Sequence, residues 1–259
     1  MSVLFIPGLW IHSTAWDPWR ELFARNGFDS AAPGWPGEAA DAALTRQAPE
    51  RLAGVGVQEL TDHYARQAKA LGEPPLVVGH SFGGLVAQKL LAAGVARAAV
   101  AIDPAPIKGV KALPLAQIRS ALPVLRKRTN RDGTVMLTRR QFRYGFGNAV
   151  SREESDRLYQ RHAIPGPGRP IFELTAAKKD PASPVEVDLD DSRRGALLIL
   201  GGGRDHTVPA VAARQAAALY RPGQRTDYRE LPGKGHSLVF DDGWREVAGI
   251  VLTYLKEQS

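Results

Sequence analysis

The order of apolar and polar residues predicts strands and helices in alternation over the first hundred residues. Short apolar runs bounded by turn residues are typical of buried strands, and they occur at residues 3–6, 28–32, 75–78 and 98–102. Between them, apolar residues recur at the spacing of one helix face, at residues 16–26, 57–71 and 82–93. Strands that alternate with helices in this way favour a parallel sheet with helices on its faces.

The pattern changes after Asp103. Pro and Gly divide the chain into short helical stretches at residues 113–125, 138–146, 152–162 and 170–178. The rhythm of strand and helix then returns at residues 196–200, 209–220, 226–231 and 244–256. We therefore predict an α/β protein with one core domain of about six mostly parallel strands, formed by residues 1–106 and 195–259. Residues 107–194 are predicted to form a helical lid inserted between two core strands.

The composition limits the chemistry that this core can carry out. The chain of 259 residues contains no cysteine, which excludes disulfides, thiolate metal sites and a cysteine nucleophile. Neither a His-Glu-x-x-His pattern nor another ligand spacing is present, so we expect neither a metal nor a cofactor. The reactive side chains must then come from Ser, His, Asp, Glu or Lys.

Two features of the chain bear on its location. The first residues lack the basic segment and the long apolar stretch of a secretory signal. The longest apolar runs, such as residues 196–200, are far shorter than the roughly 20 residues that a membrane span requires. We therefore expect a cytoplasmic protein without a membrane partner.

The net charge of +7 is concentrated in one segment. Residues 107–194 contain 18 Lys and Arg against 10 Asp and Glu, whereas the rest of the chain contains 16 against 17. A nucleic-acid-binding domain would add aromatic stacking motifs or a recognition helix, and none stands out. We expect no nucleic-acid partner and interpret the basic segment as a solvated face, with steering of an anionic ligand as the alternative.

The sharpest local motif is the sequence Gly-His-Ser-Phe-Gly-Gly at residues 79–84. It contains the pattern G-x-S-x-G between a predicted strand and a predicted helix, so Ser81 would lie at a tight bend at the carboxyl edge of the sheet. Small residues suit such a bend, because a side chain there would collide with the neighbouring strand and helix. The alternative role for Ser81 is to cap the helix that starts at Phe82, but a cap would not require the glycines.

A serine hydroxyl needs a base and an orienting carboxylate to become a nucleophile. Asp205 follows the predicted strand at 196–200, and His236 follows the strand at 226–231. Both would therefore lie on loops at the same sheet edge as Ser81. Asp103 is the rival for the acid, because it ends the strand at 98–102 and could also reach a histidine.

The chain resembles the α/β-hydrolase family over most of its length, and most closely the compact, cofactor-free carboxylesterases and their perhydrolase and chloroperoxidase-like relatives. The matching segments are Pro7-Gly8-Leu9-Trp10, the bend at 79–84, Gly203-Arg204-Asp205-His206-Thr207-Val208-Pro209 and Gly235-His236-Ser237. The order Ser, Asp, His is also that of the family. Two features depart from it: the usual N-terminal hairpin is missing, and Pro7 stands where many members have His.

The resemblance implies an oxyanion hole made by the backbone N–H groups of Leu9 and Phe82, with Trp10 as the alternative to Leu9. Trp10, together with Phe142 and Phe146 from the predicted lid, is a candidate for an apolar substrate pocket above Ser81. The other interpretation of the two phenylalanines is that they form a small core within the lid.

A Ser-His-Asp triad carries out acyl transfer. We therefore expect a carboxylesterase that cleaves small to medium esters through an acyl-enzyme on Ser81, with a small-molecule ester as its partner. Perhydrolysis with peroxide and lactone hydrolysis use the same three residues and stay open. A ligand-binding protein of the same fold with vestigial turnover also stays open. A serine nucleophile argues against the dehalogenases and epoxide hydrolases of the fold, whose nucleophile is Asp.

Overall fold

The computed structural model describes residues 1–190, 194–221 and 225–258. Six strands form one sheet in the order β2-β1-β3-β4-β7-β8, and every pairing in it is parallel. The strands are β1 (Ser2–Ile6), β2 (Asp29–Ala31), β3 (Leu76–His80), β4 (Ala98–Ile102), β7 (Leu197–Gly202) and β8 (Thr226–Leu231). The predicted parallel sheet of about six strands is confirmed.

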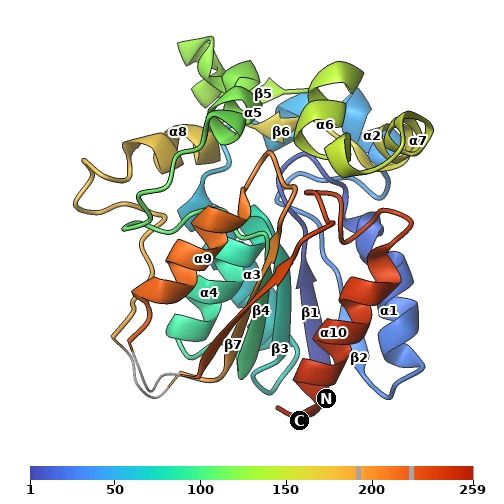
Figure 1. Ribbon diagram of the computed structural model, residues 1–259, viewed down its shortest axis with the longest axis vertical. Coiled ribbons are helices and arrows are strands. Elements are labelled where there is room, and N and C mark those ends of the chain that lie inside the picture. Colours follow the sequence, from blue (N-terminus) through green and yellow to red (C-terminus); the bar gives the residue numbers. More distant parts are fainter. Residues whose placement is uncertain (191–193, 222–224, 259) are drawn as a thin grey trace.

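Helices cover both faces of the sheet (Figure 1). Helices α1 (Asp17–Ala24) and α10 (Trp244–Lys256) lie on one face, and α3 (Val57–Ala70), α4 (Phe82–Ala92) and α9 (Ala210–Leu219) lie on the other. The four inner strands β1, β3, β4 and β7 are buried almost throughout, which explains why their sequences are mostly continuous apolar runs. The edge strand β8 instead alternates between exposed and half-buried residues.

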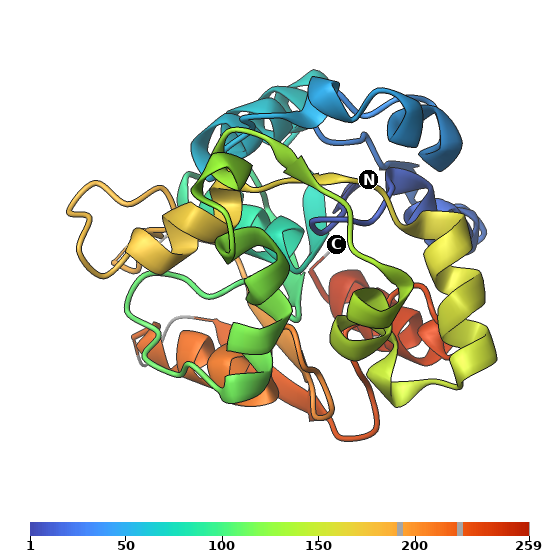
Figure 2. The same ribbon diagram turned by 90° about the horizontal axis from the view of Figure 1, so that it is seen from above.

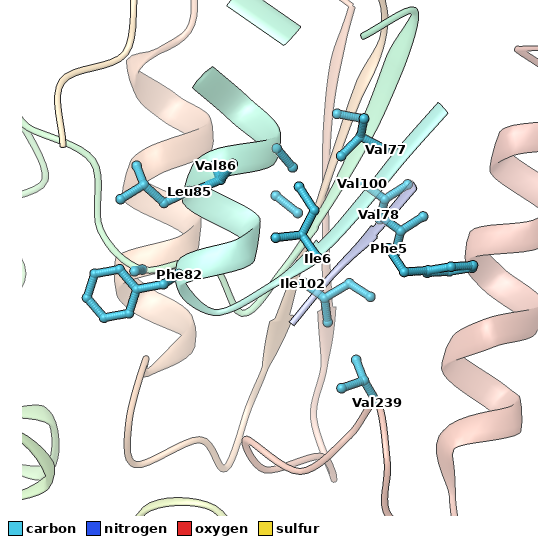
Figure 3. Packing of buried hydrophobic residues seen from close by; sticks show 14 of the residues in the cluster. Phe5, Ile6, Val77, Val78, Phe82, Leu85, Val86, Val100, Ile102 and Val239 are labelled. Carbon is cyan, nitrogen blue, oxygen red and sulfur yellow. The ribbon is translucent and has the colours of Figure 1, made fainter. Parts of the chain in front are cut away.

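The core continues across the sheet into the helices on each face. Figure 3 shows Phe5 of β1 on the face of the sheet that is opposite to α4. The ring of Phe5 lies 5.0 Å from that of Trp16 and 5.2 Å from that of Phe23, measured between centroids. Trp19 Nε1 donates a hydrogen bond of 2.7 Å to the carbonyl oxygen of Val239. These contacts join the first helix to the loop that follows β8.

The segment between β4 and β7, here called the insert, lies over the carboxyl edge of the sheet (Figures 1 and 2). Its helices are α5 (Leu115–Leu125), α6 (Arg139–Gly145), α7 (Arg152–His162) and α8 (Arg169–Ala176). It also contains a two-stranded sheet, because β5 (Thr134–Val135) pairs with β6 (Gly166–Pro167). Neither of these strands was predicted, since two residues are too few to show a strand pattern. The division into a core and a lid stays a prediction.

The insert is tied to the loop that follows β1. Trp10 Nε1 donates a hydrogen bond of 3.0 Å to the carbonyl oxygen of Val135, and Ile164 N–H donates one to the carbonyl oxygen of Trp10. Ile11 forms an isolated antiparallel bridge with Ala163. One unpredicted helix, α2 (Ala42–Gln47), also lies near the insert.

Among the described residues, none of the helices combines the length and the apolar character that crossing a bilayer would require.

Candidate active site

Ser81 occupies a strained bend between β3 and α4. Its φ and ψ are 55° and −121°, and its N–H donates a hydrogen bond of 2.9 Å to the carbonyl oxygen of Ile102. A Cβ at Gly79 would lie 2.0 Å from the carbonyl oxygen of Gly83, and a Cβ at Gly83 would lie 2.2 Å from the carbonyl oxygen of Ile6. Only glycine fits at these two positions. The Ser81 side chain makes no capping hydrogen bond to α4, so the capping role that the sequence left open is not observed.

Positive φ angles outside glycine mark three residues in the described part of the chain. They are Trp10 at 70°, Ser81 at 55° and Asp103 at 42°, and they follow β1, β3 and β4 in turn. A left-handed conformation costs a non-glycine residue free energy, and such strain gathers at functional sites. Three strained residues at one edge of the sheet therefore mark this edge as the candidate functional site.

His236 and Asp205 are in direct contact. The distance from His236 Nδ1 to Asp205 Oδ2 is 2.5 Å, and both side chains are buried. Asp205 Oδ1 accepts hydrogen bonds from the N–H groups of Thr207, at 2.6 Å, and Val208, at 2.9 Å. Asp205 therefore fixes the orientation of the imidazole and leaves Nε2 of His236 for another partner.

Burial sets the protonation of this pair. It lowers the pKa of His236 below the usual value for histidine and raises the pKa of Asp205. The imidazole is therefore neutral at neutral pH. A neutral imidazole whose Nδ1–H is held by a carboxyl group can accept a proton at Nε2.

No hydrogen bond joins Ser81 Oγ to His236, and His236 Nε2 has no hydrogen-bond partner among the described residues. Ser81 and His236 nevertheless lie near the same side chain, because the ring of His80, the residue before Ser81, lies 4.5 Å from that of His236. Gly8 allows the loop after β1 to approach these side chains, since a Cβ there would lie 2.8 Å from Ser81 Cβ. Hydrogen bonds between catalytic groups are often long without a ligand and shorten when one binds.

Asp103 is the second carboxyl group beside His236. Its Oδ2 lies 3.9 Å from His236 Nδ1 and has no hydrogen-bond partner among the described residues. Its Oδ1 accepts a hydrogen bond of 2.5 Å from the N–H of Gly202. Burial, together with the charge of Asp205, raises the pKa of Asp103 well above its usual range. At 2.5 Å against 3.9 Å, Asp205 and not Asp103 is the carboxyl group in contact with the imidazole.

Strand β7 ends at Gly202, two residues beyond the strand predicted at 196–200. Gly201 and Gly202 pair with Glu230 and Leu231 of β8. A run of glycines carries no strand signal, so the pattern could not show that β7 continues to this point. The extension brings the N–H of Gly202 to Asp103.

A cavity of about 810 Å³ opens beside Ser81. Leu9, Trp10, Ser81 and Phe82 lie on its wall. The remaining wall is mainly apolar and comes from residues 105–113, from helices α5 and α8, and from the loop at 207–208. Among the described residues, no hydrogen bond uses the backbone N–H of Leu9 or Phe82 as its donor, so both groups are free to bind a ligand in the cavity.

Phe142 and Phe146, expected from the sequence in the substrate pocket, are not among the residues that line this cavity. Phe146 packs its ring 4.8 Å from that of His236, and Phe142 stacks on Phe146 at 5.0 Å. Both are buried. They support the imidazole from the side of the insert, a contact that depends on how the insert folds over the sheet.

The contact of His80 with His236 was not predicted from the sequence. The ring of His80 is buried against His236, and neither of its nitrogens has a hydrogen-bond partner among the described residues. Burial lowers the pKa of His80 well below its usual value. His80, Asp103 and His236 offer three possible metal-ligand atoms within 4.8 Å of one another, but an ion bound to His236 Nδ1 would compete with Asp205.

Comparison with known proteins identifies the family of the chain. Residues 3–250 match the model of the alpha/beta hydrolase family. This match covers most of the chain, and the protein belongs to the alpha/beta hydrolase family, as the resemblance of its motifs predicted. No curated protein sequence is similar enough to this chain to count as a match.

Several solved structures share the fold at low sequence identity. Monoacylglycerol lipase from Paleococcus ferrophilus aligns over 100% of this chain and 95% of its own, with a TM-score of 0.70 and 19% identity. An esterase from Thermogutta terrifontis aligns over 100% and 90%, with 0.70 and 18%. The methylesterase MES16 from Arabidopsis aligns over 99% of both chains, with 0.66 and 13%. At such identities the likeness concerns the fold.

Proposed function

We propose that this protein is a serine carboxylesterase that cleaves small to medium carboxylic esters through an acyl-enzyme on Ser81. The observation that carries the proposal is the pair of His236 and Asp205, joined at 2.5 Å beside a serine on a strained bend. Ser81 also lines a cavity with a mainly apolar wall, which suits the acyl or alcohol part of an ester.

The proposed reaction has two steps. Ser81 Oγ attacks the ester carbonyl carbon while His236 Nε2 takes the hydroxyl proton, and this proton then passes to the leaving alkoxide as the ester C–O bond breaks. Water next attacks the acyl-enzyme, giving its proton to His236, which returns it to Ser81 as the carboxylic acid leaves. Asp205 stays ionised and stabilises the imidazolium in both steps.

The unpaired N–H groups of Leu9 and Phe82 support an oxyanion hole. Both residues lie on the cavity wall together with Ser81. An ester carbonyl attacked by Ser81 would place its developing negative charge toward these donors. Removal of one such donor costs roughly 3 to 4 kcal/mol in other enzymes.

The insert fits the role of a lid in this proposal. It supplies much of the cavity wall, through residues 107–113 and helices α5 and α8. Its side chains on that wall would therefore select the substrate, while Phe146 packs against His236 from the side of the insert.

Hydrolysis of p-nitrophenyl esters of increasing acyl length tests the proposal. We expect multiple turnovers, and we expect Ser81→Ala to lower kcat by about four orders of magnitude or more. Ser120→Ala is the matched control, because Ser120 is the other serine on the cavity wall, and it should keep its kcat. Release of one equivalent of p-nitrophenol without further turnover would contradict esterase function and support a ligand-binding protein. Equal loss in both variants, or in neither, would contradict the assignment of Ser81.

A further inference from the structure

The exposed apolar side chains of this protein are concentrated on one short segment. Leu113, Leu115, Ile118 and Leu122 are 67%, 83%, 36% and 38% exposed. They are four of the seven large apolar side chains that are exposed in the described part of the chain. Single exposed apolar residues are ordinary, but a contiguous group marks a surface that something else covers. These four residues are called the α5 face below.

Helix geometry places three of these residues on one side of α5. Leu115, Ile118 and Leu122 are spaced i, i+3 and i+7, so they form one stripe along the helix. Gln117 and Val124 of the same helix are buried. Helix α5 lies at the end of the molecule opposite to both termini (Figure 1), and the view from above shows it on the near side of the insert (Figure 2). The stripe is thus an apolar surface at an outer end of the protein.

The α5 face continues into the wall of the cavity beside Ser81. Leu113 and Ile118 belong both to the exposed face and to the cavity wall. An apolar molecule that leaves a surface in contact with the α5 face therefore reaches the cavity along apolar side chains.

The charge around the α5 face favours an anionic occupant. Residues 107–143 contain ten Lys and Arg but only one acidic residue, Asp132, so the positive charge of the insert belongs to this part of it. Lys111, Arg126, Lys127 and Arg128 are exposed, and none of them forms a salt bridge with a described residue. A second copy of this chain would bring like charges together on this face. An anionic surface would gain from the same charges.

We propose that the α5 face docks on an anionic lipid surface, with its leucines and isoleucine in the headgroup and acyl boundary and the surrounding Lys and Arg on the headgroups. Apolar side chains flanked by cations are the features by which interfacial helices bind such surfaces. This contact is peripheral and needs no spanning helix, so it differs from the absence of a membrane partner expected from the sequence. Delivery of apolar esters from the surface to Ser81 rests on the proposed function, whereas docking itself does not.

Co-sedimentation of the full chain with lipid vesicles tests the docking. We expect binding to equimolar phosphatidylcholine and phosphatidylglycerol at low salt, and weaker binding at high salt and to phosphatidylcholine alone. The double variant Leu115→Ser with Leu122→Ser should lower the partition coefficient by about tenfold or more, because two buried leucines are lost from the interface. The double variant Lys127→Glu with Arg128→Glu should lower it by about twentyfold or more.

Matched controls separate docking from general effects of charge and folding. Val211→Ser removes an apolar side chain that is 41% exposed on α9, and Lys69→Glu reverses an exposed charge on α3. Both should bind as the unsubstituted protein does. Leu115 and Leu122 do not line the cavity, so their variant should keep its thermal unfolding midpoint and its turnover of p-nitrophenyl acetate.

Three results would overturn the proposal. They are absence of binding to the anionic vesicles at low salt, equal binding by the leucine variant and the unsubstituted protein, and a dimer in sedimentation velocity that the leucine variant abolishes while vesicle binding is absent. Vesicle binding is measured without turnover, so a failure of the esterase assignment would leave this test intact, with the unfolding midpoint as the check on folding.

Discussion

Exchange of each carboxyl group beside His236 for an amide separates the roles of Asp103 and Asp205. Asp205 lies 2.5 Å from His236 Nδ1, whereas the nearest oxygen of Asp103 lies 3.9 Å away. Asp205→Asn removes the charge that stabilises the imidazolium and leaves an amide at the distance of a hydrogen bond. We expect kcat/KM to fall by roughly three to four orders of magnitude.

The expected effect of Asp103→Asn depends on the charge of Asp103. An ionised carboxylate at 3.9 Å would stabilise the imidazolium by about 4 kcal/mol at an effective dielectric constant of about 20, or roughly a thousandfold in rate. The raised pKa of Asp103 favours its neutral form, and an asparagine can still accept the hydrogen bond from the N–H of Gly202. We therefore expect Asp103→Asn to keep kcat/KM within about threefold.

The assay is kcat/KM for one p-nitrophenyl ester at neutral pH, with thermal unfolding measured for both variants. A stable Asp103→Asn protein that loses as much activity as Asp205→Asn would refute the reasoning. It would show that Asp103 is charged and shares the role of the acid.

Three further expectations concern the bend, the base and one buried histidine. Gly83→Ala should destabilise the protein by about 3 kcal/mol or more, because its Cβ would meet the carbonyl oxygen of Ile6. Gly249→Ala, at an exposed position of α10 where nothing lies within 4 Å, should stabilise it by about 1 kcal/mol. Urea unfolding compares the two variants, and equal effects would contradict the account. His236 must be unprotonated to act as a base and its pKa is lowered, so kcat/KM should fall with decreasing pH through a midpoint below 6.5; a midpoint above 6.5 would be inconsistent with a neutral buried imidazole. Burial lowers the pKa of His162 from 6.5 to about 4, so the unfolded chain binds one more proton between these values and stability falls as the pH falls. His162→Phe should therefore lose about 3 kcal/mol less free energy of unfolding between pH 6.5 and 4, and identical losses would rule this coupling out.

The pattern of apolar residues predicted those strands and helices whose buried side chains recur at regular spacing along the sequence. The bounds of β4 and α10 agree with the structure residue for residue, because continuous apolar runs and helical spacing are local signals. The bend at Ser81 was also predicted from the sequence, because a bend of this kind brings backbone atoms so close that only small residues fit around it. Asp205 and His236 were expected at one sheet edge because each follows a predicted strand, and the structure places them in contact.

Contacts between the insert and the core could not be predicted. The packing of Phe146 on His236, and its absence from the cavity wall, depend on how α6 lies over the sheet. The distances of the two carboxyl groups from His236 Nδ1, 2.5 Å for Asp205 and 3.9 Å for Asp103, also depend on packing that the sequence pattern does not show. The exposure of Leu115 and Leu122 on α5 could not be predicted either, since a leucine at helical spacing normally indicates a core position.

Labelling with a fluorophosphonate probe tests the central assignment most directly, because the probe forms a bond to an activated serine oxygen. After proteolysis, mass spectrometry should find the added phosphonyl group on the peptide that contains Ser81, and His236→Ala should slow the labelling strongly. Labelling of another serine, or rapid ester turnover by a protein that stays unlabelled at Ser81, would contradict the account.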